Sequence, residues 1–282
     1  MKAGGARNPP YPPLEKGGTG APGRRGTECP GKEGFGRKNS RLKVLNVSVD
    51  PVDMDQAIDR IEHFLSSERR PHSVFAVNPE KSCLMSRDPS FCRAFSTADM
   101  LIPDGVGIVL AARILHGVYL HRVTGIDLMK KLCCYASERG RKVFVYGSTE
   151  EVNKKAVERL RLRYPGLQVA GRADGYTTSH QMSDLLDKIN GSGAEILFLA
   201  LGSPKQEKWY LSHAGKLENV RICQGVGGSL DAIAGNVKRA PKLWRILGME
   251  WLFRLISEPA RFRRQKSLLL FAIRVFAAKL GG

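Results

Sequence analysis

The chain of 282 residues is 42% hydrophobic, so it is long and apolar enough to bury the core of a globular protein. Its 45 lysines and arginines outnumber its 27 aspartates and glutamates. The net charge of +18 favours a polyanionic partner, whether nucleic acid, anionic lipid or a phosphorylated substrate. The sequence contains no run of about 18 apolar residues, so we expect no transmembrane helix.

The excess charge lies at the two ends of the chain. Residues 1–41 carry nine basic and three acidic side chains, residues 240–282 carry nine basic and two acidic ones, and only +5 is left for the 198 residues between. The first segment holds ten Gly and six Pro and has no apolar centre. We therefore predict a disordered basic tail over 1–41, and not a signal peptide.

From Leu42 onward, short β-branched runs alternate with helical stretches. The predicted strands are residues 43–49, 73–78, 100–103, 142–147, 167–171, 195–202 and 221–227. Between them, Ile58, Ile61, Phe64 and Leu65 share one helical face. This alternation predicts an α/β fold over a core of 42–239: a Rossmann-like, mostly parallel sheet with helices on both faces.

Three of the predicted helices carry start signals. Thr124-Gly-Ile-Asp127 and Ser148-Thr-Glu-Glu151 are capping-box patterns. Asp53-x-Asp55 has the form of a pair that coordinates a divalent ion, but it follows a proline and opens a helix, so capping explains it.

The six cysteines show no C-x-x-C pairing and no zinc spacing. We expect buried thiols in a reducing compartment, with no metal and no cofactor.

After residue 239 the pattern changes to two amphipathic helical stretches interrupted at Pro259. Leucines and aromatic residues alternate there with arginines, which is typical of a segment that lies in a membrane interface. A terminal helix that docks on the core and keeps its basic face in solvent explains the same pattern. Residues 240–282 are therefore predicted to be a basic helical appendage.

Polar residues follow five of the predicted strands, at the edge where parallel sheets bind ligands. They are Asn78, Asp104, Gly147-Ser148, Ser203 to Gln206, and Gly225 to Asp231. Asp104 ends an apolar run and precedes glycine, so it is either the N-cap of the next helix or a partly desolvated carboxylate that serves as a general base.

The other candidates also have two interpretations each. Gln206 completes a capping-box pattern with Ser203, and Asn78 before proline suits a turn. Arg122 precedes a capped helix, where it contacts either an anionic substrate or solvent. The glycine-rich stretch that includes Gly227, Gly228 and Asp231 is either a phosphate pocket or a tight turn, because it is not a G-x-G-x-x-G motif.

Taken together, these residues resemble a known family. The motifs are VNPE (77–80), ADMLIPDGVGIVLAARILHG (98–117), RVTGIDLM (122–129), VFVYGS (143–148), ADGY (173–176), LGSPKQEKW (201–209) and the stretch from GVGGSLD to EPAR (225–261). In this order they resemble the WecG/TagA/CpsF family of bacterial glycosyltransferases. The resemblance implies a Rossmann-like core with a C-terminal appendage. It also implies transfer of an N-acetylmannosamine-type sugar from UDP to a polyprenyl-diphosphate-linked N-acetylglucosamine, in cell-surface polysaccharide or teichoic acid synthesis.

The resemblance also assigns roles to particular residues. Asp104 matches the proposed catalytic base, and Asn78, Arg122 and Gln206 match polar residues of the donor and acceptor pocket. Arginines that complete the site over the diphosphate at the membrane are matched by Arg254, Arg261 and Arg264. One departure is Ala76, where relatives often carry threonine, so a different UDP-hexose donor, for capsule or exopolysaccharide synthesis, is the alternative.

The resemblance implies a UDP-sugar and the lipid-linked acceptor as partners. Together with the basic C-terminal segment, it predicts a cytoplasmic protein that is peripheral on the anionic inner face of the cell membrane. A nucleic-acid-binding protein is disfavoured because the basic C-terminal segment is interleaved with leucine and the core is nearly neutral. A dinucleotide-dependent oxidoreductase is disfavoured by the missing fingerprint. Homo-oligomer formation is left open.

Overall fold

The structure is a computed structural model that describes residues 41–67, 70–237, 241, 244, 252–253 and 262–281. The side chains of 67 and 262–265 are outside the description. The predicted tail falls almost wholly outside the described residues, as does most of the segment between 238 and 261.

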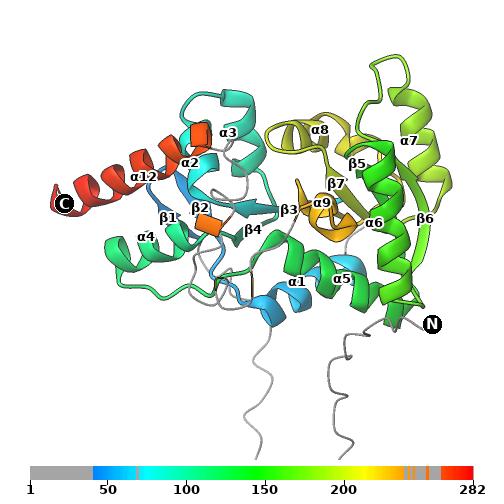
Figure 1. Cartoon of the computed structure of the whole chain (residues 1–282), viewed down its shortest axis with the longest axis horizontal. Coiled ribbons are helices and arrows are strands. Elements are labelled where there is room, and N and C mark those ends of the chain that lie inside the picture. The colour runs from blue at the N-terminus through cyan, green and yellow to red at the C-terminus, as the bar shows by residue number, and fades with distance from the viewer. Residues whose placement is uncertain are drawn as a thin grey trace, which may run out of the picture. The chain divides into compact units, whose positions relative to one another are not determined.

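The described elements alternate between strands and helices (Figure 1). The strands are β1 (Leu42–Val44), β2 (Val47–Val49), β3 (His72–Val77), β4 (Met100–Pro103), β5 (Lys142–Gly147), β6 (Gln168–Ala173), β7 (Ile196–Ala200) and β8 (Ile222–Gly225). The helices are α1 (Met54–Ser67), α2 (Pro79–Met85), α3 (Pro89–Ser96), α4 (Val106–His116), α5 (Gly125–Arg139), α6 (Glu150–Arg163), α7 (Met182–Gly191), α8 (Lys205–His213), α9 (Ser229–Ala234) and α12 (Phe262–Leu280), with a 3-10 turn η1 (Ala214–Lys216) after α8.

Six of the strands form one sheet in the order β4-β3-β8-β7-β5-β6, and every neighbouring pair is parallel. The parallel α/β sheet predicted from the sequence is therefore confirmed. Because all six strands point the same way, their carboxyl ends meet at one edge of the sheet. The strands β4, β3, β8 and β7 are consecutive in this order, which brings together residues that follow positions 77, 103, 200 and 225.

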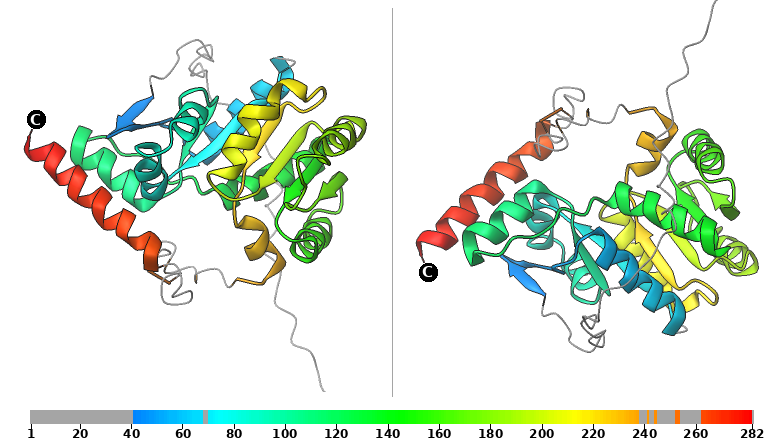
Figure 2. Two further views of the ribbon diagram at one scale, coloured as in Figure 1. Left: turned by 90° about the horizontal axis from the view of Figure 1, so that it is seen from above. Right: turned by 90° about the horizontal axis from the view of Figure 1, so that it is seen from below.

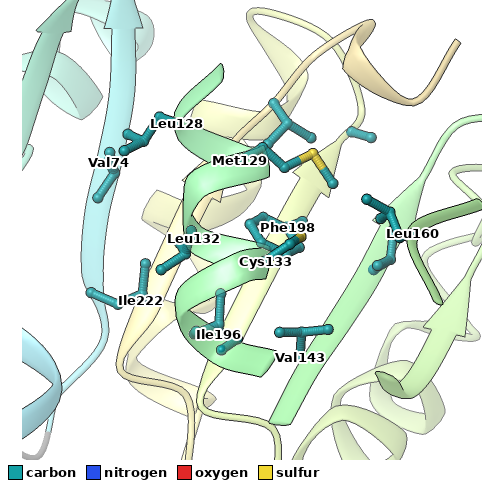
Figure 3. Packing of buried hydrophobic residues seen from close by; sticks show 14 of the residues in the cluster. Val74, Leu128, Met129, Leu132, Cys133, Val143, Leu160, Ile196, Phe198 and Ile222 are labelled. Atoms are coloured by element: carbon teal, nitrogen blue, oxygen red, sulfur yellow. The ribbon is translucent and has the colours of Figure 1, made fainter. Parts of the chain in front are cut away.

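Helices cover both faces of the sheet, because successive strand residues point to opposite sides. In β3, Val74 and Ala76 belong to the buried cluster that also holds residues of α1, α5, α6 and α9. Phe75 and Val77 belong to the cluster on the other face, with residues of α2, α3 and α4. Figure 3 shows Leu128 and Leu132 of α5 lying over the strands that carry Val74 and Ile222. In a third cluster, residues of α7 and α8 pack with residues of β5 and β7.

The first predicted strand, 43–49, is instead a hairpin. β1 and β2 pair antiparallel outside the main sheet, and Leu45 between them has a φ of 54°. Asn46 follows Leu45, and its side-chain amide donates to the Ser82 carbonyl at 2.8 Å. No turn signal stands at this position in the sequence, because the residue in the left-handed region is a leucine and not a glycine.

The helix starts agree with two of the three predicted caps. Asp53 and Gln56 exchange backbone-to-side-chain hydrogen bonds at 2.8 and 3.0 Å, which caps α1. Thr124 caps α5, since its hydroxyl accepts from the Asp127 backbone at 3.2 Å. The prediction for Ser148 is wrong by one residue. Thr149 caps α6, while Ser148 has a φ of 62° and lies in the preceding turn.

The five described cysteines are free thiols: Cys83, Cys92, Cys133, Cys134 and Cys223. Burial raises the pKa of Cys133 to about 12, which makes it unreactive at neutral pH. The sixth, Cys29, lies outside the described residues.

The C-terminal helix α12 packs against α2 and α4 and lies alongside α4 in both views of Figure 2. Phe271 and Val275 are 2% and 3% exposed and join the core cluster on this face of the sheet. The Cys83 thiol donates to the Ser267 carbonyl at 3.4 Å. This part of the predicted appendage is therefore a helix docked on the core. None of the helices in the described part of the chain is long and apolar enough to cross a bilayer.

Candidate functional site

A cavity of about 540 Å³ opens at the carboxyl ends of β4, β3, β8 and β7. This volume is within the range of small-molecule binding sites. The predicted site residues that line it are Asn78, Asp104, Arg122, Gln206, Gly227 and Gly228. Four of the five polar strand ends identified in the sequence thus meet at one cavity. Within the described residues, no three His, Cys, Asp or Glu side chains gather as they would around a metal ion.

Asp104 does not cap the helix that follows it. The N-cap of α4 is Gly105, which makes no side-chain cap hydrogen bond. Instead, Asp104 Oδ2 accepts from the backbone N–H of Gly125 at 3.3 Å, across the cavity wall at the start of α5. A bond of this length is weak, and it orients one oxygen of the carboxylate toward the start of α5.

Gly125 is itself held from the other side. Gln224, buried in β8, donates its side-chain amide to the Gly125 carbonyl at 2.9 Å. Gly125 is therefore bonded on one side to Asp104, which follows β4, and on the other to Gln224 in β8. Gln224 was missed in the sequence because only the fold brings β8 beside the start of α5.

The glycines after Asp104 let α4 approach α2. A Cβ at Gly107 would lie 2.6 Å from Pro79 Cγ, and one at Gly105 would lie 3.1 Å from Pro79 Cδ. Real Cβ atoms do not come as close as the first of these distances, so a side chain at 107 would push the two helices apart. The Pro-Asp-Gly sequence thus places the carboxylate on a strand end and packs the next helix tightly behind it.

Asn78 is an N-cap as well as a lining residue. Its Oδ1 accepts from the Lys81 backbone N–H at 2.9 Å, which starts α2 directly after β3. The simple turn expected before Pro79 is therefore a capped helix start. The cap uses the amide oxygen, so the side-chain nitrogen of Asn78 is the donor that remains for a ligand.

Gln206 does not form the predicted capping box with Ser203. Pro204 is the N-cap of α8 and makes no side-chain cap hydrogen bond. Gln206 is 2% exposed, and its Oε1 accepts from the Gly227 backbone N–H at 3.0 Å. The capping pattern fails because this side chain turns toward the loop after β8 instead of toward its own helix start.

The glycine-rich stretch after β8 forms part of the cavity wall. Gly227 and Gly228 line the cavity, and Gly227 has a φ of 51°, which favours glycine. A Cβ at Gly225 would lie 2.6 Å from Gln206 Nε2, so a glycine there makes room for that amide. Asp231 lies in the first turn of α9, behind Gly228 and outside the residues that line the cavity.

Arg122 and α12 close two other sides. Arg122 lines the cavity from the segment between α4 and α5, and Ser267 and Leu268 line it from α12. Arg254 and Arg261 lie outside the described residues, and the side chain of Arg264 is also outside the description. Their assignment to the site stays a prediction.

The fifth polar strand end, Gly147-Ser148, does not line this cavity. The Ser148 backbone N–H donates to the Ala200 carbonyl at 3.0 Å, and its carbonyl accepts from Gly175 at 2.7 Å. These bonds hold the ends of β5, β6 and β7 together, so the backbone there has a structural use.

Two buried polar residues of the wall were not predicted to line it. Lys81 and Thr124 both line the cavity and are 7% and 8% exposed. Thr124 was predicted only as a helix cap. Lys81 carried no signal, because a lysine in the first turn of a helix is usually solvated.

The chain is similar to proteins of a known family. The sequence model described as "Glycosyl transferase WecG/TagA/CpsF family" matches residues 42–282. A protein of Bacillus spizizenii named N-acetylglucosaminyldiphosphoundecaprenol N-acetyl-beta-D-mannosaminyltransferase is 31% identical over 230 residues, which cover 81% of this chain and 88% of that protein. A protein of the same name from Bacillus subtilis is 31% identical over 232 residues, which cover 82% of this chain and 90% of that protein.

Proposed function

The chain belongs to the WecG/TagA/CpsF family and is a glycosyltransferase, and from this premise we propose the reaction that it performs. It transfers an N-acetylmannosamine-type sugar from a UDP-sugar to N-acetylglucosamine on a polyprenyl diphosphate. The names of both Bacillus relatives support this acceptor and this sugar. The observation that carries the proposal is the Asp104 carboxylate, oriented by Gly125 at the wall of a cavity built from four strand ends.

In this proposal Asp104 is the general base. It removes the proton from the acceptor hydroxyl as that oxygen attacks the anomeric carbon of the donor. UDP leaves from the opposite face, so the configuration at that carbon is inverted. A positioned carboxylate base increases the rate of such a reaction about 10²–10⁴-fold. The Gly125 N–H, at 3.3 Å from Oδ2, orients the carboxylate at the wall of the cavity.

The leaving diphosphate needs positive partners and hydrogen-bond donors. We propose that Arg122, together with the backbone N–H of Gly228, supplies them without a metal ion. Asn78 and Gln206 are assigned to the sugar and diphosphate. Asp231, in the first turn of α9 and outside the residues that line the cavity, keeps its predicted substrate-binding role as part of this proposal. The arginines at 254, 261 and 264 complete the site when the protein meets the membrane.

The proposed partner surface is the anionic inner face of the cell membrane, with residues 240–282 as the attached appendage and 42–239 as the core. α12 supports this proposal. Opposite its docked side it exposes Leu269, Ile273, Phe276 and Leu280, each between 57% and 88% exposed. Their spacing of three and four residues places them on one stripe, which Lys266, Arg274 and Lys279 accompany. An exposed apolar stripe with basic neighbours suits a lipid interface better than a fully solvated helix face.

Product analysis tests the reaction. The protein is incubated with a panel of UDP-sugars and a short-chain polyprenyl-diphosphate N-acetylglucosamine, with and without a chelator. We expect mass spectrometry to show one added N-acetylhexosamine from UDP-N-acetylmannosamine, and NMR to show an inverted linkage, in both conditions. Preference for another UDP-hexose would favour the alternative donor, which Ala76 in the cavity wall makes relevant. Loss of turnover with the chelator would refute the metal-free mechanism.

A further inference from the structure

A continuous line of buried polar contacts connects α2 to the loop after β8. Lys81 Nζ lies 2.8 Å from Glu207 Oε1, and Gln206 Nε2 donates to the same oxygen at 3.1 Å. The Gly227 backbone N–H then donates to Gln206 Oε1 at 3.0 Å. Lys81, Gln206 and Glu207 are 7%, 2% and 0% exposed. We call Lys81, Glu207, Gln206 and Gly227 the polar strut.

The strut fixes which way the Gln206 amide points. An ionised carboxylate only accepts hydrogen bonds, so the Gln206 atom beside Glu207 must be the nitrogen. A backbone N–H only donates, so the atom beside Gly227 must be the oxygen. Both ends therefore reject the flipped amide, which would place two acceptors together at one end and two donors at the other.

The ammonium of Lys81 is the counter-charge for the buried carboxylate. It lies in the first turn of α2, 126 residues from Glu207 in the sequence, and also over the Phe95 ring at 5.4 Å. Removing one partner of a buried ion pair leaves an uncompensated charge, which is more harmful than removing both.

The orientation has a consequence for the cavity, where Lys81, Gln206 and Gly227 are all lining residues. The Gln206 amide nitrogen has two N–H groups, of which Glu207 accepts one. The second is a donor suited to a phosphate or sugar oxygen. The oxygen end of the same amide holds the Gly227 backbone in place.

We propose that Glu207 is a positioning residue that acts through Gln206, and that Lys81 holds Glu207 in turn. Together they present an amide donor and the Gly227 loop to the diphosphate side of the donor nucleotide. This inference rests on the proposed function for the identity of that ligand. Glu207 itself does not line the cavity, so it acts without touching the nucleotide.

The first test uses the ligand-free protein and reads hydrogen exchange at the Gly227 amide by NMR. We expect Glu207→Gln and Gln206→Ala each to speed exchange at Gly227 at least tenfold, while amides in β5 and β7 keep their protection. Lys208→Met is the matched control, because it removes the neighbouring ion pair of α8, with Asp88 at 2.6 Å, and leaves the strut intact. Unchanged exchange at Gly227 in Glu207→Gln would overturn the proposal.

The second test is a double-mutant cycle on the Kd for UDP, measured by calorimetry, and on the kinetic constants for donor and acceptor. We expect Glu207→Gln to weaken UDP binding about tenfold and to raise KM for the donor more than for the acceptor. If Glu207 acts through Gln206, Glu207→Gln adds nothing further in a Gln206→Ala background. Independent, multiplicative losses would overturn the proposal.

A third variant separates positioning from the stranded charge. The double variant Lys81→Met, Glu207→Gln removes both charges of the buried pair. It leaves no uncompensated charge, so we expect it to fold also if Glu207→Gln alone fails to fold. We expect it still to show fast exchange at Gly227 and weak UDP binding, whereas restored UDP affinity would overturn the proposal. If the wild-type protein binds no UDP and transfers no sugar, the proposed function fails, and exchange at Gly227 still decides whether the strut exists.

Discussion

Truncating Phe271 tests whether α12 is part of the catalytic unit. Phe271 is 2% exposed and packs with the cluster of α2 and α4, so Phe271→Ala removes a nearly complete aromatic burial. Such a change costs about 3–5 kcal/mol. Phe276 on the same helix is 58% exposed, so Phe276→Ala costs below about 1 kcal/mol and serves as the matched control for stability.

The loss is expected to fall on the docking of α12. A cost of about 3 kcal/mol shifts a local docking equilibrium about a hundredfold, because 1.4 kcal/mol corresponds to a factor of ten. Hydrogen exchange should therefore accelerate about a hundredfold in α12 of Phe271→Ala and stay slow in the sheet. Because Ser267 and Leu268 line the cavity, turnover of the lipid acceptor should fall while UDP binding remains.

Phe276→Ala should show the opposite pattern. It should keep α12 protected and weaken binding to anionic vesicles, since Phe276 belongs to the exposed apolar stripe. If Phe271→Ala undocked α12 without lowering acceptor turnover, α12 would not be part of the catalytic unit. If Phe276→Ala bound anionic vesicles as well as the wild type does, the exposed stripe would not be a lipid contact.

Two further predictions concern stability. Burial raises the pKa of Asp99, but hydrogen bonds from His72, Arg70 and the Ser73 backbone outweigh it and hold the pKa below its usual value. A depressed native pKa stabilises the fold above the unfolded pKa of about 3.9, and this contribution is lost as the pH falls through the native pKa. Asp99→Asn should therefore lower the free energy of unfolding in urea by about 1–3 kcal/mol at pH 7, and the difference should shrink steadily below about pH 4; a constant difference would contradict the assignment. Gly147→Ala should lower the free energy of unfolding by more than about 2 kcal/mol. Gly147 has a φ of 125°, and a Cβ added there would lie 2.6 Å from the Ala200 carbonyl oxygen. An unchanged Tm would contradict this strain.

The position of the site was predictable from the sequence because it depends on topology. A parallel sheet gathers the residues after its strands, so Asn78, Asp104, Gln206 and Gly227 meet wherever the strand order makes their strands neighbours. Gly147-Ser148 was the exception. β5 lies beyond β7 in the sheet, and the backbone at its end bonds to Ala200 and Gly175.

The local roles were less predictable, because short motifs have more than one solution. Gln206 and Asp104 both match capping patterns, yet each turns toward a segment that is distant in the sequence. Capping competes with tertiary hydrogen bonds of similar strength, and the fold decides between them. Lys81 and Glu207 are 126 residues apart, and no local pattern connects them.

Asp104→Asn tests most directly whether Asp104 is the base of a sugar transfer at this cavity. UDP release is followed with UDP-N-acetylmannosamine and the short-chain lipid acceptor, and the UDP Kd is measured in parallel. Asp88→Asn is the control, since it lies outside the cavity and asparagine still caps α3. We predict that Asp104→Asn lowers kcat about 10²–10⁴-fold with the UDP Kd unchanged, while Asp88→Asn turns over normally. Undiminished turnover by Asp104→Asn would contradict the account.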